Sequence, residues 1–209
     1  MEKKKVLVLA PHTDDGEFGC GGTIARLIDE GNSVYYVAFS TCRASVPEGE
    51  SPDVLKKELI ESMKVFKIPS NQVFVFDYPV RRFSENRQDI LEDIIKIQNN
   101  LEPDIVFAPS QRDIHQDHKV ISDEAMRAFK KCTLLFYEIP WNNFSFNNQA
   151  YYIINDKHLD VKKRAIACYK SQSTRNYSDE KFTIGQAIMH GIQIGAKYAE
   201  VFEVARCVL

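Results

Sequence analysis

The chain has 209 residues, 44% of them apolar, a formal net charge of −2 and a sequence isoelectric point near 6.2. This length suits one sizeable α/β domain better than two, so we expect a single domain over residues 1–209. The weak negative charge argues against a nucleic-acid partner, and no apolar run approaches the length of a membrane span.

Short apolar runs alternate with longer amphipathic segments, a pattern typical of parallel strands joined by crossover helices. Strands are predicted at 6–10, 34–39, 73–76, 105–108, 134–139, 151–154 and 201–208. Helices are predicted at 23–30, 51–67, 84–99, 120–130, 161–169 and 180–191. The longest loops, 41–50 and 140–149, are expected to shape a substrate pocket.

The five cysteines are widely spaced, odd in number and contain no Cys-x-x-Cys pair. They favour neither a disulfide framework nor a thiolate zinc site. The lysine-rich start is followed by an apolar run that is too short for an export signal. We therefore expect a cytoplasmic protein.

The turn after the first predicted strand holds His12, Asp14 and Asp15. His12 and Asp15 are spaced so that both side chains can point at one ion, which leaves Asp14 free for another task. The two aspartates could instead cap the coming helix, as acidic residues often do. The glycines at 19, 21 and 22 are expected to let the backbone turn sharply before that helix. They lack the third glycine of a G-x-G-x-x-G dinucleotide loop, and no acidic residue ends the second strand.

A second polar cluster, His115, Asp117 and His118, follows the fourth predicted strand, with Asp113 just upstream. A lone His-x-x-His more often marks the start of a helix than a metal site. The nucleotidyltransferase signature also spaces two histidines in this way, but it needs a glycine where Asp117 stands. Because the carboxyl ends of parallel strands lie at one edge of the sheet, the loops that carry the two clusters can reach one crevice. Together they supply the three ligands and the extra carboxylate typical of a catalytic metal site.

Three stretches, APHTDD at 10–15, GCGGTI at 19–24 and HQDH at 115–118, resemble the signature of the LmbE-like (PIG-L) zinc-dependent N-deacetylases. Residues 163–166, leading to Ser171 and Gln172, also resemble the family's downstream helix and its Ser-Gln ending. The resemblance implies a Rossmann-like three-layer α/β sandwich with a mostly parallel central sheet. It also implies removal of an N-acetyl or other N-acyl group from a small amide, such as an amino sugar or its conjugate.

Position by position, the resemblance implies that His12, Asp15 and His118 hold a Zn²⁺ ion. Two imidazoles and one carboxylate leave such an ion charged enough to polarise a carbonyl and to acidify its bound water. The same ligand set also suits Fe²⁺ or another divalent ion. Zinc is favoured by the resemblance.

The resemblance further implies that Asp14 is the general base and that His115 stabilises the oxyanion. Water bound to zinc would attack the amide carbonyl, and Asp14 would take its proton and pass it to the departing amine. A protonated His115, held by Asp117, would face the negative charge that develops on the intermediate.

The chain departs from the commonest family pattern at two positions. Thr13 stands where proline is usual, and Gly16 stands where an acidic residue is usual. Neither is implied to be a ligand, but the two departures leave open which groups surround the ligands and which substrate is taken. Glu17 is a candidate replacement for the missing acid.

Three other residues are weaker candidates for substrate contacts. Arg43, after the second strand, could bind a hydroxyl or an anion, although a solvated surface arginine is more common. Glu138 lies on the expected active-site edge, and Trp141 could stack on a sugar ring. Ordinary capping and packing explain Glu138 and Trp141 equally well.

Two alternative functions remain at this point. A metal site of this kind could hydrolyse an ester or phosphoester, or the chain could be a degenerate protein that only binds a metal or a carbohydrate. The presence of Asp14 and His115 argues against the second, because binding alone needs no base. The expected partner is a small N-acylated molecule, and association into a homo-oligomer is implied by the resemblance alone.

Overall fold

A computed structural model describes residues 3–208 as alternating strands and helices. The strands are β1 (Lys5–Ala10), β2 (Ser33–Ala38), β3 (Val73–Val75), β4 (Ile105–Pro109), β5 (Thr133–Tyr137), β6 (Ala150–Ile154) and β7 (Tyr198–Arg206). The helices are α1 (Asp15–Asp29), α2 (Val54–Phe66), α3 (Arg87–Leu101), α4 (Gln116–Ala128), α5 (Asp156–Ile166) and α6 (Glu180–Gln193). Within residues 3–208, no helix is both long enough and apolar enough to cross a membrane.

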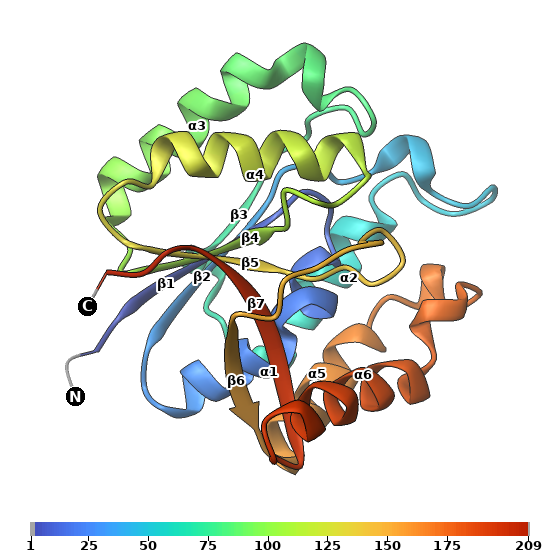
Figure 1. The fold of residues 1–209 in the computed structure, drawn as a ribbon. Coiled ribbons are helices and arrows are strands. Elements are labelled where there is room, and N and C mark those ends of the chain that lie inside the picture. The colour runs from blue at the N-terminus through green and yellow to red at the C-terminus, as the bar shows by residue number, and fades with distance from the viewer. Residues whose placement is uncertain (1–2, 209) are drawn as a thin grey trace.

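The seven strands form one sheet in the order β3-β2-β1-β4-β5-β7-β6. Strands β1 to β5 pair in parallel, whereas β7 runs antiparallel to both β5 and β6. Helices α3 and α4 cover one face, and α1, α2, α5 and α6 lie on the other (Figure 1). The expected three-layer α/β architecture with a mostly parallel sheet is confirmed.

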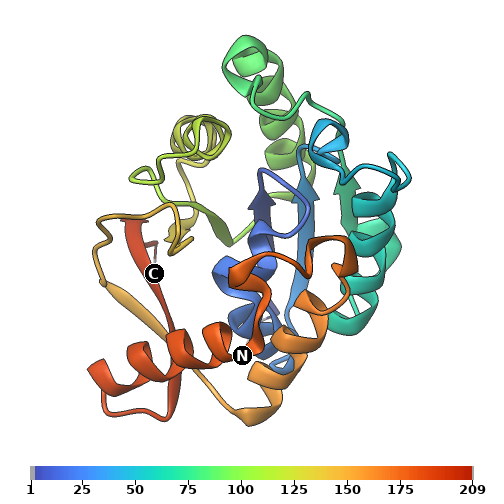
Figure 2. The same ribbon diagram turned by 90° about the vertical axis from the view of Figure 1, so that its right-hand side faces the viewer.

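The sheet core divides by the alternation of side chains along each strand. In β1, Val6, Val8 and Ala10 pack on the side of α1, and Leu7 and Leu9 pack on the side of α3 and α4. Both faces are therefore buried, which explains the continuous apolar run of this strand. The arrowheads of β1 and β2 point the same way in Figure 2 and mark the edge where their following loops begin.

Helix α1 begins at Asp15, not at 23 as predicted, so the glycine run lies inside the helix. Its glycines allow close packing: an added Cβ would lie 2.2 Å from Cδ2 of Tyr137 at Gly19 and 2.6 Å from Cδ1 of Ile154 at Gly22. Tertiary contact here outweighs the low helix propensity of glycine. The helix bends at Cys20, where φ is −147°.

Other helix starts also differ from the prediction. Helix α5 begins earlier, at Asp156, because Asn155 and His158 form a capping box in which each side chain bonds the other's backbone N–H. Helix α2 begins at Val54, not at 51 as predicted, and Asp53 occupies its N-cap position. Helix α4 begins at Gln116, not at 120 as predicted. Both histidines of the second cluster, His115 and His118, therefore lie at its start.

Strand β7 carries two buried glutamates that reach both motif-bearing segments. Glu200 accepts hydrogen bonds from the backbone N–H groups of Gly22 (2.9 Å) and Thr23 (2.6 Å) in α1. Glu203 accepts one from Ser110 Oγ (2.6 Å) and pairs with Arg112 (3.0 Å) in the loop after β4. Through these contacts, β7 holds both α1 and the loop after β4.

Candidate active site

The two sequence clusters meet at one edge of the sheet. β1 and β4 are adjacent and parallel, so the loops that follow them open side by side. Their histidines and aspartates line a cavity of about 170 Å³, to which the loops predicted to shape a pocket contribute Cys42, Ser45, Trp141 and Asn142. The crevice expected from the sequence is present.

Three donor atoms form a nearly equilateral triangle in this cavity. Nδ1 of His12, Oδ2 of Asp15 and Nε2 of His118 lie 3.2 Å from one another along each edge. Ligands about 2.05 Å from a tetrahedral Zn²⁺ stand about 3.3 Å apart, and neighbouring ligands of an octahedral ion at about 2.1 Å stand about 3.0 Å apart. The triangle therefore fits Zn²⁺ and equally fits Fe²⁺.

A second triad, His12, His115 and His118, is looser, because its ligand atoms lie within 4.8 Å of one another. The Asp15 triangle is the better metal site. Its three edges match metal–ligand geometry, and it includes a carboxylate that offsets the charge of the ion.

Buried carboxylates orient both histidines of the triangle. Asp117 Oδ2 lies 3.0 Å from Nε2 of His12, and Asp113 Oδ2 lies 2.7 Å from Nδ1 of His118. Each ring can donate its proton to a carboxylate and turn its other nitrogen toward the triangle. Burial by itself would lower the pKa of His118, but Asp15 and Asp113 raise it to about 10. Without a metal, this ring carries a proton at neutral pH.

Asp14 is half-buried beside the triangle, at the N-cap position of α1. Its side chain caps no backbone N–H of that helix, so capping does not explain this carboxylate. Burial, and then the negative charge of Asp15, raise the pKa of Asp14 to about 6. The group is a carboxylate at neutral pH and is close to its titration range, as suits a base.

The state of His115 differs from the expectation. Its Nδ1 accepts a hydrogen bond from the backbone N–H of Asp117 (3.2 Å), and the Asp117 carboxylate bonds His12 instead. Burial, with the neighbouring His118 and His12, lowers the pKa of His115 to about 4. The prediction of a protonated ring held by Asp117 is therefore wrong: the ring is neutral and carries its proton on Nε2.

A buried hydroxyl network lies behind the His12–Asp15 turn. Tyr36 and Tyr169 each place a hydroxyl near the Thr13 carbonyl oxygen (3.0 and 2.7 Å), and both also bond Glu17. Burial raises the pKa of Glu17 to about 7. An added Cβ at Gly16 would lie 2.6 Å from the Tyr36 ring, which explains why no acidic side chain stands there. Glu17 thus supports the turn from behind.

Of the weaker substrate candidates, only Trp141 lines the cavity, where it stacks on Tyr177 with ring centroids 4.0 Å apart. Arg43 is exposed and pairs with Asp53 (3.0 Å) and Asp77 (3.4 Å) outside the cavity. Glu138 faces away from it, because its carboxylate bonds His190 (3.1 Å) and Gln186 (3.1 Å) of α6. Arg43 and Glu138 therefore do not line the cavity, and the surface position of Arg43 is the one that its sequence context favoured.

Several residues in or directly behind the cavity were not assigned a role from the sequence. Asp113 could have been suspected, because it stands two residues before His115. The sequence does not show, however, that its carboxylate bonds His118. Arg81 follows β3 at the same sheet edge, where the strand-end rule applies. Arg175 and Tyr177 come from an irregular segment without any pattern in the sequence.

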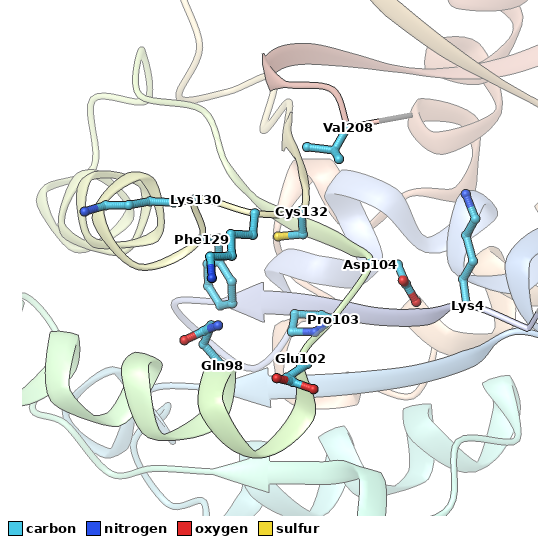
Figure 3. A pocket seen from close by; sticks show the side chains of 10 residues that line it. Lys4, Gln98, Glu102, Pro103, Asp104, Phe129, Lys130, Cys132 and Val208 are labelled. Carbon is cyan, nitrogen blue, oxygen red and sulfur yellow. The ribbon is translucent and has the colours of Figure 1, made fainter.

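A larger cavity, of about 440 Å³, opens at the opposite end of the sheet (Figure 3). Its lining includes residues just before β1, β4 and β5, namely Lys4, Asp104 and Cys132. Lys130 points away from the other labelled side chains. Ligands of parallel sheets bind at the carboxyl ends of the strands, and this cavity lies at the amino ends. It has no part in the site described above.

A family model and two relatives that resemble this chain are all described as deacetylases. The family model PIG-L, described as GlcNAc-PI de-N-acetylase, matches residues 7–129. The uncharacterized deacetylase YaiS of Escherichia coli is 29% identical over 177 residues, which cover 81% of this chain and 92% of YaiS. Diacetylchitobiose deacetylase of Thermococcus kodakarensis is 24% identical over 218 residues, covering 94% and 81% of the two chains.

Among solved structures, the conserved protein TT1542 of Thermus thermophilus superposes with a TM-score of 0.84 and 26% identity. The alignment covers 99% of this chain and 96% of TT1542. The family match includes both motif-bearing turns, and the fold agrees over nearly the whole chain. The chain therefore belongs to the PIG-L (LmbE-like) family, and the Escherichia coli and Thermococcus kodakarensis relatives are both named as deacetylases.

Proposed function

We propose that this protein is a metal-dependent N-deacetylase that removes an acetyl group from a small amide of the amino-sugar type. The observation that carries the proposal is the triangle of His12, Asp15 and His118 donors with an uncommitted carboxylate, Asp14, beside it. The named activity of the diacetylchitobiose deacetylase relative supports the choice of an N-acetylated sugar.

His12, Asp15 and His118 would hold the ion, for which Zn²⁺ is our first choice and Fe²⁺ the alternative. When bound, a divalent ion polarises the substrate carbonyl and acidifies water. Asp113 and Asp117 keep the two imidazoles in the orientation that leaves one nitrogen of each facing the triangle.

Asp14 moves the proton in the proposed reaction. Its carboxylate accepts a proton from the attacking water and then gives that proton to the nitrogen of the departing amine. A pKa of about 6 supports both steps, because the group is mostly ionised at neutral pH and yet holds a proton long enough to transfer it.

His115 donates a hydrogen bond from Nε2 to the carbonyl oxygen as negative charge develops there. A neutral imidazole suits this role, because its pKa of about 4 leaves Nε2 protonated and Nδ1 bound to the Asp117 backbone. The exposed part of the Trp141 ring offers an apolar face for a sugar.

The test separates metal binding from turnover. Asp14→Asn should retain zinc and lose about 10²- to 10⁴-fold in acetate release from N-acetylated sugars. His118→Ala should lose zinc, measured as bound metal per chain after dialysis. Asp53→Asn, an exposed carboxylate outside the cavity, is the matched control and should behave as the wild type. Full activity of Asp14→Asn would refute the general-base role, and activity unchanged by chelator would refute the metal dependence.

A further inference from the structure

Two arginines at the mouth of the catalytic cavity have no assigned role. Arg81, from the loop after β3, and Arg175, from the segment before α6, both line the cavity and are exposed. Seven other arginines pair with carboxylates: Arg26, Arg43, Arg82, Arg87, Arg112, Arg127 and Arg164. Within residues 3–208, neither cavity arginine has such a partner, so both guanidinium groups are available to a ligand.

The backbone of Arg81 is hydrogen-bonded to the carboxylate that orients His12. Its N–H donates to Asp117 Oδ2 (2.6 Å), the same oxygen that lies 3.0 Å from Nε2 of His12. Arg81 has φ of +68°, a left-handed conformation that costs a residue with a side chain roughly 1–2 kcal/mol. Glycine would adopt this conformation without that cost, so the arginine side chain stands here despite the strain.

The side chain of Arg81 turns toward the cavity loops, where Nη2 donates to Ser45 Oγ (3.3 Å). This bond uses one of five guanidinium N–H groups and leaves the rest for a ligand. Arg175 lies in the segment that also carries Tyr177, the ring stacked on Trp141. It also lines an adjoining hollow of about 660 Å³, whose other charged residues are Lys170 and Asp179.

The interior of the cavity has the opposite charge. Asp14 and Asp15 line it, and Asp113 and Asp117 lie directly behind the histidines. An anion entering such a site is repelled unless cations stand at the mouth. Two unpaired arginines there, contributed by separate loops, form the planar forks that bind carboxylates and phosphates.

We propose that Arg81 and Arg175 form an anion subsite that selects substrates bearing a carboxylate or phosphate on the amine-side portion of the N-acyl compound. This inference rests on the proposed deacetylase function for the choice of substrate. The binding step itself does not depend on turnover, which allows the two to be tested separately.

Trp141 makes the binding test direct, because it is the only tryptophan of the chain and lines the cavity. Its fluorescence is titrated in the zinc-loaded protein with three glucosaminides that have no acetyl group to lose. One carries a carboxymethyl group, the second the isosteric neutral carbamoylmethyl group, and the third is glucosamine 1-phosphate. The wild type should bind the carboxylate or the phosphate about tenfold more tightly than the carboxamide at low salt, as charge-assisted pairs allow.

Arg81→Gln and Arg175→Gln should each reduce this preference severalfold, and the double variant should abolish it. Arg82→Gln is the matched control, because Arg82 is adjacent, exposed and paired with Glu85 outside the cavity (3.1 Å). In turnover of the N-acetylated carboxymethyl compound, the Arg81 and Arg175 variants should raise KM and leave kcat nearly unchanged.

Equal affinities for the charged and neutral ligands in the wild type would overturn the subsite, as would a preference that survives in the double variant. Failure to bind any of the three ligands would also overturn it. A clear anion preference without acetate release would instead refute the deacetylase function and leave the subsite intact. The ratio of phosphate to carboxylate affinity then identifies which anion the subsite takes.

Discussion

Replacing Lys162 should show how strongly the buried charges beneath α1 hold that helix. Lys162 Nζ donates to Glu200 Oε1 (2.6 Å) and to the Phe18 carbonyl (2.7 Å), and the two side chains are only 4% and 6% exposed. Lys162→Met keeps most of the side-chain volume and removes the ammonium group. Glu200 then remains as a buried carboxylate that has lost its counter-charge.

Breaking a buried ion pair from one side typically costs about 3–5 kcal/mol. Glu200 keeps two backbone N–H donors, from Gly22 and Thr23, so we expect the lower end, about 3 kcal/mol. An unfolding entropy of about 2.1 cal/mol/K per residue gives about 0.44 kcal/mol/K for this chain, so Tm should fall by about 7 °C.

The measurement is urea unfolding followed by far-UV circular dichroism and Trp141 fluorescence. Lys162→Met/Glu200→Gln should recover a substantial part of the loss, because the uncompensated charge is gone. Lys157→Met, on the same helix but exposed and paired with Asp29, should change the free energy of unfolding by less than about 0.5 kcal/mol. The reasoning fails if Lys162→Met costs under about 1 kcal/mol, or if the two substitutions simply add.

Three further predictions concern packing, pH and metal. Gly19→Ala should destabilise by about 2 kcal/mol because its Cβ meets the Tyr137 ring, whereas Gly185→Ala, with nothing within 4 Å, should be neutral or stabilising in the same urea assay. The pKa of Glu17, about 7 in the native state against an ordinary 4.5, means that unfolding releases a proton. Relative to Glu17→Gln, the chelator-treated wild type should therefore lose about 3 kcal/mol of stability as pH rises from about 4.5 to 7. Glu17→Gln should lack this slope, and parallel pH curves for the two proteins would contradict the assignment. Zinc at about 1,000 times its Kd should raise the free energy of unfolding by about 4 kcal/mol in the wild type, seen as a higher Tm, and should leave His118→Ala unchanged.

The sequence was sufficient to predict the architecture and to predict that the side chains proposed to bind the metal lie close together. Buried parallel strands are continuous apolar runs, and polar residues at their ends reveal the ligand-binding edge without knowledge of long-range contacts. His12, Asp15 and His118 were found by that rule and by the family resemblance. Their 3.2 Å triangle agrees with the predicted ligand set, while the catalytic roles remain predictions.

Features that depend on distant packing were not accessible in the same way. The start of α1 was missed because the space around Gly19 is set by Tyr137, which is far away in the sequence. The state of His115 depended on which atom of Asp117 faces it, the backbone N–H or the carboxylate. Glu138 was placed at the site by its position near a strand end, but His190 of α6 draws its carboxylate to another face.

The position of β7 has a consequence for how the site forms during synthesis. Gly22 and its partner Glu200 are separated by 178 residues, and Ser110 and Glu203 by 93. A ribosome that adds about 5–20 residues per second takes roughly 10 to 35 seconds to pass from Gly22 to Glu200. During that interval α1 lacks the carboxylate that accepts the N–H groups of Gly22 and Thr23. This support of α1, behind the proposed metal site, is therefore completed only when β7 takes its place between β5 and β6.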